Sequence, residues 1–257
     1  VYKRQGGIDS ALTATVAVDA LGSNNVVGVA LPSKYNTEES LVDARLLAEN
    51  LDIEFKVIEI EEIVNIFRNT LKESVNDELG PITDENIQSR VRGNILMALS
   101  NQTGAMVVST GNKSEMAVGY STLYGDLAGG FALLKDLYKT EVYNLANFRN
   151  SISNVIPQNT IDKEPSAELR PDQFDKDSLP EYELLDEILR MYIEEDSSSE
   201  KIISKGIDEN IVYDVLSKVD RNEYKRKQVA PGVKLTEKAF GKDRRMPITN
   251  TYIRERG

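Results

Sequence analysis

Neither cysteine nor histidine occurs in the chain, and this absence removes several classes of catalyst. Without a thiol or an imidazole, the protein cannot form a Ser-His-Asp triad, a cysteine nucleophile or the usual zinc site. Any metal must therefore be a hard cation held by oxygen ligands, and Mg²⁺ accompanied by phosphates is the natural candidate.

Long apolar runs are also missing from the sequence. No stretch approaches the length of a membrane span, and no charged-then-apolar segment precedes Gly6. Zero cysteine is consistent with the cytosol. We therefore expect a cytoplasmic protein without a membrane partner.

Positive charge is scarce outside the last part of the chain. The net charge is −11, with 31 Lys and Arg against 42 Asp and Glu, whereas residues 218–257 are basic. An acidic bulk argues against nucleic acid as a partner. The clusters Lys225–Lys227 and Lys242–Arg245 have little aromatic interleaving. By default they form a solvated face, and contact with an anionic small molecule is the alternative.

The segment Gly6–Ser10, Gly-Gly-Ile-Asp-Ser, opens directly into a predicted helix that ends at Leu21. Glycines let backbone N–H groups turn toward a ligand, and a helix N-terminus adds unpaired donors and partial positive charge. The loop is either an anion cradle or a plain glycine turn with Asp9 or Ser10 as the N-cap. The downstream sequence favours the cradle.

Apolar segments typical of buried strands alternate with helical patterns up to about residue 150. Strands are predicted at Val26–Leu31, Phe55–Ile60 and Ala105–Val108. Helices are predicted from Thr37 to Leu51, around Ile63–Leu71, and from Thr83 or Asp84 to Gly104. This rhythm predicts an α/β fold, Rossmann-like, with an open parallel sheet and helices on both faces.

The ends of the chain depart from that rhythm. After Ser151 an acidic, proline-punctuated stretch leads to helices at Leu184–Tyr192 and Ile211–Leu216, which we interpret as a helical cover on the sheet. The start, Val-Tyr-Lys-Arg-Gln, is not the apolar strand from which such a loop normally hangs. We therefore expect one domain over residues 1–257, with its first strand missing and residues 1–5 foreign or truncated.

Two polar loops follow strand ends, Gly6–Ser10 and Ser109–Glu115. Ligands of open α/β sheets bind beyond the carboxyl ends of strands near a switch point. If the two strands are neighbours, Asp9 and Glu115 face one cleft and make a magnesium site beside phosphates. Glu115 alone would be an ordinary surface acid.

The glycine-rich segment Gly119–Gly130 is either a functional loop or a packed connector. Lys135 and Lys139 follow it and can place positive charge near phosphate oxygens. On the preceding helix, Arg90 and Arg92 stand two residues apart and point apart, so at most one faces the ligand.

Together these segments resemble the synthetase domain of NAD synthetases, most closely the form fused to a glutamine-hydrolysing domain. The resemblance covers almost the whole chain from Gly6. It rests on the motifs Gly6–Ser10, Leu31–Tyr35, Ser109–Glu115, Ala117–Phe131, Pro165–Pro171 and Val219–Lys227.

The resemblance implies an ATP-dependent ligase that amidates deamido-NAD to NAD. The nicotinate carboxylate would attack the α-phosphorus of ATP and release pyrophosphate, and ammonia would then displace AMP. Positioning and charge stabilisation carry such chemistry, so no His or Cys nucleophile is needed. The family forms obligate homodimers with the dinucleotide site near the shared interface, and its ammonia arrives directly or from glutamine.

The resemblance also assigns residues. Pyrophosphate contacts fall on Gly6, Gly7, Asp9 and Ser10, further ATP contacts on Thr110, Lys139 and Ser166, and magnesium ligation on Asp9 and Glu115. Asp9, Glu115 and Lys139 would be catalytic. Deamido-NAD contacts fall on Asn86, Arg90, Glu115, Asp126 and Lys225, with Tyr120 placed to stack on nicotinate. Arg244 and Arg245 have no assigned role.

Three departures from the family pattern leave alternatives open. Gln5 stands where the family loop begins with Ser, the apolar strand before it is absent, and a cysteine-bearing glutaminase domain is absent. A nucleotide-binding fragment without turnover is therefore a second hypothesis. The third is another pyrophosphate-loop adenylating enzyme acting on another carboxylate or on tRNA, which the matches at Ser109–Phe131 and Val219–Lys227 disfavour.

Overall fold

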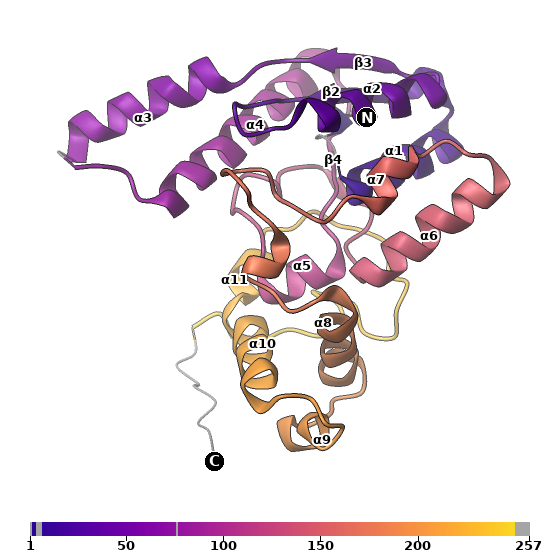
Figure 1. Cartoon of the computed structure of the whole chain (residues 1–257), viewed down its shortest axis with the longest axis vertical. Helices are drawn as coiled ribbons and strands as arrows, with labels where there is room; N and C mark the ends of the chain where they lie inside the picture. Colours follow the sequence, from indigo (N-terminus) through magenta and orange to yellow (C-terminus); the bar gives the residue numbers. More distant parts are fainter. Residues whose placement is uncertain (1, 4–6, 76, 250–257) are drawn as a thin grey trace.

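Five short strands lie in the part of the chain that the computed structural model describes, residues 2–3, 7–75 and 77–249 (Figure 1). Their bounds are β1 Tyr2–Lys3, β2 Val27–Ala30, β3 Glu54–Val57, β4 Val108–Ser109 and β5 Phe131–Ala132. β2 pairs with β1 and β3, β4 pairs with β5, and each of these pairs is parallel. β1 also contacts β4, so the two small sheets follow the order β3-β2-β1-β4-β5.

This order confirms the predicted parallel α/β architecture and sets where a ligand can bind. The chain leaves β1 toward β2 on one side and leaves β4 toward β5 on the other, so the direction of winding reverses between β1 and β4. Such a switch point leaves a crevice beyond the carboxyl ends of the two strands. The strand predicted at Ala105–Val108 is observed slightly later, at Val108–Ser109.

Although the sequence analysis expects the first strand to be missing, a two-residue strand, β1, precedes the loop. Tyr2 pairs in register with Val27, and Lys3 pairs with Gly28. Backbone N–H and C=O groups make these parallel pairs whatever the side chains are, so an apolar sequence is not required for a strand this short. The departure at Gln5 and the predicted pyrophosphate contact at Gly6 fall outside the described residues.

Seven helices of the described chain flank the strands: α1 Ile8–Leu21, α2 Glu38–Asn50, α3 Glu61–Val75, α4 Pro81–Thr103, α5 Lys113–Val118, α6 Lys139–Ile152 and α7 Gln158–Asp162. The predicted cap of α2 is confirmed, since Thr37 Oγ1 accepts from the Ser40 amide. The helix α4 begins at Pro81 instead of Thr83 or Asp84, because proline suits the first helical position and Gly80 is the N-cap.

Two hydrophobic clusters hold helices to the sheet. One joins α1, α2, α6 and α7, with Leu12 and Val142 at its centre. The other packs α3 and α4 against β2, with Val29 and Val64 at its centre. Within the described residues, no helix combines the length and apolarity that a membrane crossing needs.

The remaining helices form the lower part of the molecule in Figure 1. They are α8 Tyr182–Leu189, the π-helical turn η3 Arg190–Glu194, α9 Ser199–Ile203, α10 Glu209–Arg221 and α11 Glu223–Arg226. A third cluster, which includes Leu185, Ile193 and Val215, joins them to α5. They contact α5 and α6, which follow β4 and β5 in the chain, and Lys225 of α11 lines the cavity described below.

Candidate active site

A cavity of about 480 Å³ opens at the switch point between β1 and β4. Its walls come from the start of α1, from α4, from the loop after β4, and from residues 119–126 and 160–175. The cavity therefore brings together both polar loops that the sequence analysis singled out. Twelve of the predicted site residues fall among the described ones, and all of these except Arg90 line the cavity.

The start of α1 presents backbone donors to this cavity. Gly7 is the N-cap, and the Ser10 hydroxyl donates to the Gly7 carbonyl at 3.0 Å. Neither Asp9 nor Ser10 occupies the N-cap position, which corrects the simpler interpretation of this turn. The φ of Gly7 is −133°, and a Cβ built there would meet nothing within 4 Å. Folding alone therefore does not require glycine at this position, whereas a closely approaching ligand would.

Three charged side chains meet beside this turn. Lys139 Nζ lies 2.5 Å from Asp9 Oδ2 and 3.5 Å from Glu115 Oε1. Asn112, the N-cap of α5, donates from Nδ2 to Asp9 Oδ1 at 2.8 Å and accepts the Glu115 amide at 2.9 Å. The prediction that Asp9 and Glu115 share a cleft is thus confirmed, and Asn112 ties the two residues together.

Burial sets the charge state of this cluster. Desolvation and the nearby carboxylate of Asp9 raise the pKa of Glu115 to about 8. Desolvation would lower the pKa of Lys139, but the carboxylates of Asp9 and Glu115 outweigh it and raise that pKa. Lys139 therefore stays an ammonium ion, and in the ligand-free protein Glu115 holds its proton more tightly than an exposed glutamate does.

Asp175, Tyr182 and Tyr120 complete the wall around Lys139, and sequence reasoning missed the first two. Asp175 is 5% exposed and lines the cavity, and its Oδ2 accepts the Tyr182 hydroxyl at 2.8 Å. The Lys139 ammonium lies 5.2 Å from the centre of the Tyr182 ring. Burial raises the pKa of Asp175 and, together with Asp175, that of Tyr120.

Residues 163–171, here called the strap, close another side of the cavity. Glu168 ties the strap to the start of α2, because it accepts from Ser40 of α2 at 2.5 Å and from Asn36, just before the helix cap, at 2.8 Å. Within the strap it also accepts from Lys163 at 2.7 Å. The hydroxyl of Ser166 donates to the carbonyl of Gln173, two residues beyond the end of the strap. Ser166 lines the cavity, as does Thr110 on the opposite wall.

The predicted dinucleotide residues are divided by the structure. Asn86, Tyr120, Asp126 and Lys225 line the cavity, whereas Arg90 is exposed, does not line it, and donates to the Leu123 carbonyl at 3.2 Å. Asp126 accepts the Thr122 amide at 2.7 Å, and Asn86 accepts the Thr122 hydroxyl at 2.7 Å. Lys225 donates to the carbonyls of Gly119 and Ser121 at 2.6 and 2.7 Å.

The described part of the basic end is not uniformly solvated: Arg226 is buried, whereas Lys227 and Lys242 are exposed. Arg226 is 7% exposed and donates to the Ala117 carbonyl at 2.7 Å, and Arg244 stacks on Tyr192 at 4.3 Å. Guanidinium groups pack on aromatic rings while keeping their charge, so composition alone did not reveal this burial. Arg245 is exposed and donates to the Gly241 carbonyl.

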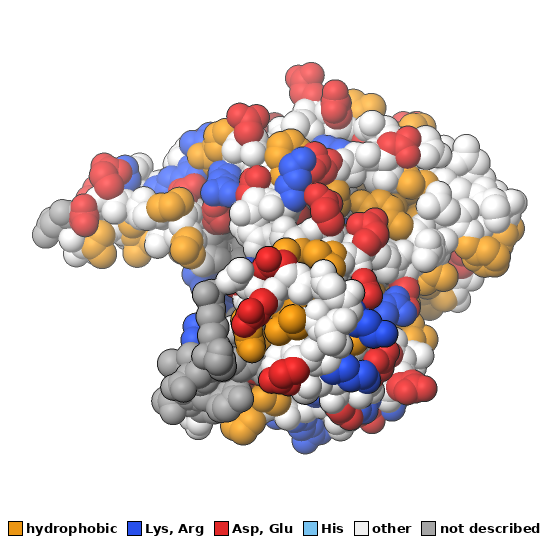
Figure 2. All heavy atoms as spheres, turned by 60° about the horizontal axis from the view of Figure 1, so that its bottom comes forward, with side chains coloured by type: hydrophobic (Ala, Val, Ile, Leu, Met, Phe, Trp, Pro, Cys, Tyr) orange, Lys and Arg blue, Asp and Glu red, His pale blue; other side chains and the backbone are white. Residues whose placement is uncertain are grey.

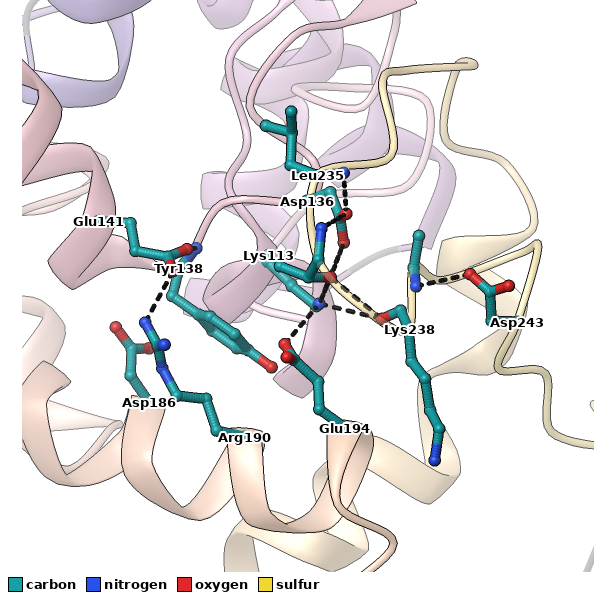
Figure 3. Close-up of polar contacts among 12 residues, drawn as sticks. Lys113, Asp136, Tyr138, Glu141, Asp186, Arg190, Glu194, Leu235, Lys238 and Asp243 are labelled. Atoms are coloured by element: carbon teal, nitrogen blue, oxygen red, sulfur yellow. Dashed lines mark hydrogen bonds and ion pairs between the residues drawn. The ribbon is translucent and has the colours of Figure 1, made fainter.

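Lys113, which sequence reasoning did not single out, anchors this end to α5 (Figure 3). Its buried ammonium lies 3.0 Å from both Asp136 and Glu194, and it donates to Thr236 and to the Lys238 carbonyl. Asp136 also accepts the amides of Leu235 and Thr236. The side chains of the adjacent residues Asn112, Lys113 and Ser114 therefore contact three different parts of the molecule.

The outer surface carries two further features. On the face of Figure 2, acidic and basic side chains are interspersed. Hydrophobic side chains lie along the arm that projects at the left of the same view, formed by α3 and the start of α4. Ile66, Phe67 and Ile82 are 64%, 45% and 73% exposed there, and Ile82 also lines the cavity.

The strand order, the switch-point cavity and the helix start that faces it define a Rossmann-like α/β protein. A family profile described as NAD synthase matches residues 1–229. The chain belongs to this family.

Named relatives agree with the profile. The chain is 54% identical over 249 residues to a glutamine-dependent NAD(+) synthetase of Aquifex aeolicus, covering 97% of the chain and 44% of that protein. A protein of the same name from Thermotoga maritima is also 54% identical, at 96% and 43% coverage. The chain thus spans less than half the length of these relatives.

Solved structures give the same result for the fold. The glutamine-dependent NAD+ synthetase of Acinetobacter baumannii, in complex with ADP, matches with a TM-score of 0.63 and 47% identity over 96% of this chain and 45% of that one. The NMN synthetase of Francisella tularensis matches with a TM-score of 0.73 and 28% identity, covering 91% and 88%.

Proposed function

We propose that the chain is the synthetase part of a glutamine-dependent NAD synthetase and uses ATP to amidate deamido-NAD. The observation that carries this proposal is the cluster of Asp9, Lys139 and Glu115 at the helix start beside the cavity, in a member of the NAD synthase family. The ADP bound to the Acinetobacter baumannii relative supports an adenine nucleotide as ligand.

The first step joins the nicotinate carboxylate of deamido-NAD to the α-phosphorus of ATP. A carboxylate oxygen forms the new oxygen–phosphorus bond, and pyrophosphate leaves with the electrons of the broken bond. Amides at the start of α1 and the open space above Gly7 hold the phosphates. The Lys139 ammonium stabilises the negative charge that gathers on the phosphate oxygens.

The second step transfers the acyl group to ammonia. The ammonia nitrogen attacks the acyl carbon, AMP departs with the bridging oxygen, and the nitrogen loses a proton as the amide forms. No protein nucleophile is needed, which suits a chain without Cys or His. Thr110 and Ser166, on opposite walls of the cavity, serve as further ATP contacts.

The residues present fit a magnesium ion that is shared with phosphates. No group of three or more possible metal-ligating side chains occurs among the described residues, so the protein supplies two carboxylates, Asp9 and Glu115. Phosphate oxygens and waters would complete the shell, as this ion prefers. When bound, Mg²⁺ offsets phosphate charge. Lys139 Nζ now lies between the carboxylates and would turn toward the phosphates.

The dinucleotide occupies the wall formed by α4 and residues 119–126. Tyr120 offers a ring for stacking on nicotinate, and Asn86 and Asp126 fix the loop around it through Thr122. Lys225, already bound to two loop carbonyls, adds positive charge near the dinucleotide phosphates. We assign Arg90 to the outer face of this loop. From there it can contact deamido-NAD only if the loop changes its conformation.

We further propose that two chains associate through the arm of α3 and α4. Its apolar residues Ile66, Phe67 and Ile82 are exposed, and Ile82 stands at the cavity. Light scattering should give the mass of a dimer for the unsubstituted chain, and Ile66→Lys should shift it toward the monomer. A monomeric unsubstituted chain would contradict this assignment.

Glutamine would supply the ammonia through a separate domain of the full-length protein. The relatives bear the name glutamine-dependent and extend well beyond the matched part, and this chain has no cysteine with which to hydrolyse glutamine. The chain itself should therefore accept ammonium salts and not glutamine.

The test is the formation of NAD and AMP from deamido-NAD, ATP, Mg²⁺ and an ammonium salt. We expect both products in equal amounts, and none when deamido-NAD is omitted. Binding of deamido-NAD without AMP release would favour a nucleotide-binding fragment. AMP release with a different carboxylate or with tRNA, and none with deamido-NAD, would favour another adenylating enzyme.

A further inference from the structure

The first turn of α6 carries Lys139 into the cavity, and its backbone amides need acceptors. The N-cap residue Tyr138 makes no side-chain cap hydrogen bond, and buried amides without acceptors are costly. The Lys139 amide donates to Ser114 Oγ at 2.9 Å, and the Thr140 amide donates to Asp186 Oδ2 at 2.9 Å. Residues from α5 and α8 therefore cap this helix from outside.

Ser114 and Asp186 form one buried unit. The Ser114 hydroxyl donates to Asp186 Oδ1, and the two residues are 0% and 2% exposed. Because Ser114 directly precedes Glu115, the carboxylate of Asp186 holds both the turn that carries Glu115 and the turn that carries Lys139. Figure 3 shows Asp186 of α8 near Arg190, the first residue of η3, and next to the segment of Tyr138.

This unit stands behind the site. Neither Ser114 nor Asp186 belongs to the described residues that line the cavity, so neither side chain is placed to touch substrate. Their hydrogen bonds instead fix the backbones from which the two charged groups extend. Asp186 can do so because both of its oxygens accept hydrogen bonds, a pattern that an asparagine with its single oxygen does not reproduce.

We propose that Asp186, acting through Ser114, is a positioning residue that sets Lys139 against Asp9 and Glu115. The inference deepens the proposed function and rests on it. Lys139 Nζ lies 2.5 Å from Asp9 and 3.5 Å from Glu115. A shift of about 1 Å in a group of this kind costs on the order of 100-fold in rate.

The test compares Asp186→Asn and Ser114→Ala with Asp220→Asn. Asp220 is a matched control, since it is 3% exposed in the same lower part of the molecule and accepts the Tyr192 hydroxyl at 2.6 Å. In the deamido-NAD assay, the first two variants should lower kcat at least about tenfold while the KM for ATP changes less than about threefold. The control should keep kcat within about twofold of the unsubstituted chain.

Two results would overturn the positioning role. These are a normal kcat in folded Ser114→Ala, or an equal loss of kcat in Asp220→Asn. If Asp186→Asn does not fold, Ser114→Ala decides, since it removes only a hydroxyl. An unsubstituted chain that forms neither NAD nor AMP would refute the proposed function and this role together, whereas an active chain with insensitive variants would refute the role alone.

Discussion

The two ends of the cavity are built in different ways. One end of the cavity, here called the chemical end, holds Asp9, Glu115 and Lys139. The Lys139 side chain is 4% exposed there, and Asn112 and the buried Ser114–Asp186 unit fix these three charged groups. At the strap, the single carboxylate of Glu168, whose side chain is 13% exposed, makes the three bonds to Asn36, Ser40 and Lys163, and the Lys163 side chain is 26% exposed.

The backbone shows the same contrast. Glu168 and Asp172, in and next to the strap, have φ angles of 49° and 48°, in the left-handed region that costs a non-glycine residue free energy. At the chemical end, the charged residues lie in the first turns of ordinary helices. The difference teaches that several buried polar contacts fix the charged groups of the chemical end, whereas the contacts of one carboxylate, Glu168, hold the strap.

The largest expected effect comes from the chemical end. Asp9→Asn removes a proposed magnesium ligand and leaves the Lys139 ammonium with a weaker partner, so NAD formation should fall at least about 100-fold. The measurement is kcat/KM for ATP. Asp19→Asn on the same helix is the matched control, because Asp19 makes an exposed pair with Arg149 and should change activity less than about twofold. Comparable losses in both variants would contradict the assignment of Asp9.

Gly7→Ala separates ligand binding from folding. The new Cβ meets no described atom within 4 Å, and φ is −133°, so stability should stay within about 0.5 kcal/mol. The same Cβ enters the space assigned to phosphates, so the KM for ATP should rise about tenfold. Gly22→Ala is the opposite control. Because the φ of Gly22 is 82°, this variant should lose roughly 1 kcal/mol of stability while its KM for ATP stays unchanged. An unchanged KM in Gly7→Ala would remove the phosphate assignment.

Releasing the strap should have a smaller effect and a different signature. Glu168→Gln weakens the bonds to Ser40 and Lys163, so the KM for ATP should rise about threefold while kcat is kept. Steady-state kinetics measure both constants. Asp162→Asn is the control, since Asp162 is exposed and bonds only Gln158 among its described hydrogen-bond partners. A drop in kcat with constant KM would show that the strap is part of the chemical end.

The smallest expected effect is on the pH dependence of the free energy of unfolding. Burial raises the pKa of Asp175 above the 3.8 of the unfolded chain, so the folded protein binds the proton more tightly. This contribution to stability must fall as pH rises from 3.8 through the raised pKa. Urea unfolding at several pH values should show that the free energy of unfolding changes less with pH in Asp175→Asn than in the unsubstituted chain.

Asp84 gives the opposite sign. A hydrogen bond from Arg68 lowers the pKa of Asp84 below 3.8. Its stabilising contribution is present above 3.8 and is lost as pH falls through the lowered pKa. The free energy of unfolding should therefore fall less in acid for Asp84→Asn than for the unsubstituted chain. The same dependence of this free energy on pH in Asp84→Asn and Asp175→Asn would contradict these pKa directions.

Sequence patterns predicted the parts that are encoded locally. The glycine loop before a helix, the cap at Thr37 and the strand–helix rhythm each depend on neighbouring residues, and the structure confirms them. Asp9 and Glu115 meet because both follow strand ends at the switch point, which the topology rule anticipates. Element bounds were less accurate, as at Pro81 and at β4.

Contacts between distant segments escaped prediction. Ser114 and Asp186 lie far apart in the chain, as do Asp175 and Lys139, and no local pattern marks either pair. The packing of Arg226 and Arg244 was not predicted, because their guanidinium groups cover aromatic rings of other segments. The side-chain direction of Arg90 depends on the loop it contacts, which lies 33 residues away in sequence.

The central claim is that this cavity joins a carboxylate to the α-phosphorus of ATP. The most direct measurement uses deamido-NAD with oxygen-18 in its nicotinate carboxylate and follows the label by mass spectrometry. The two-step reaction predicts one labelled oxygen in each AMP formed together with NAD. Unlabelled AMP, or label in inorganic phosphate beside ADP, would contradict the claim.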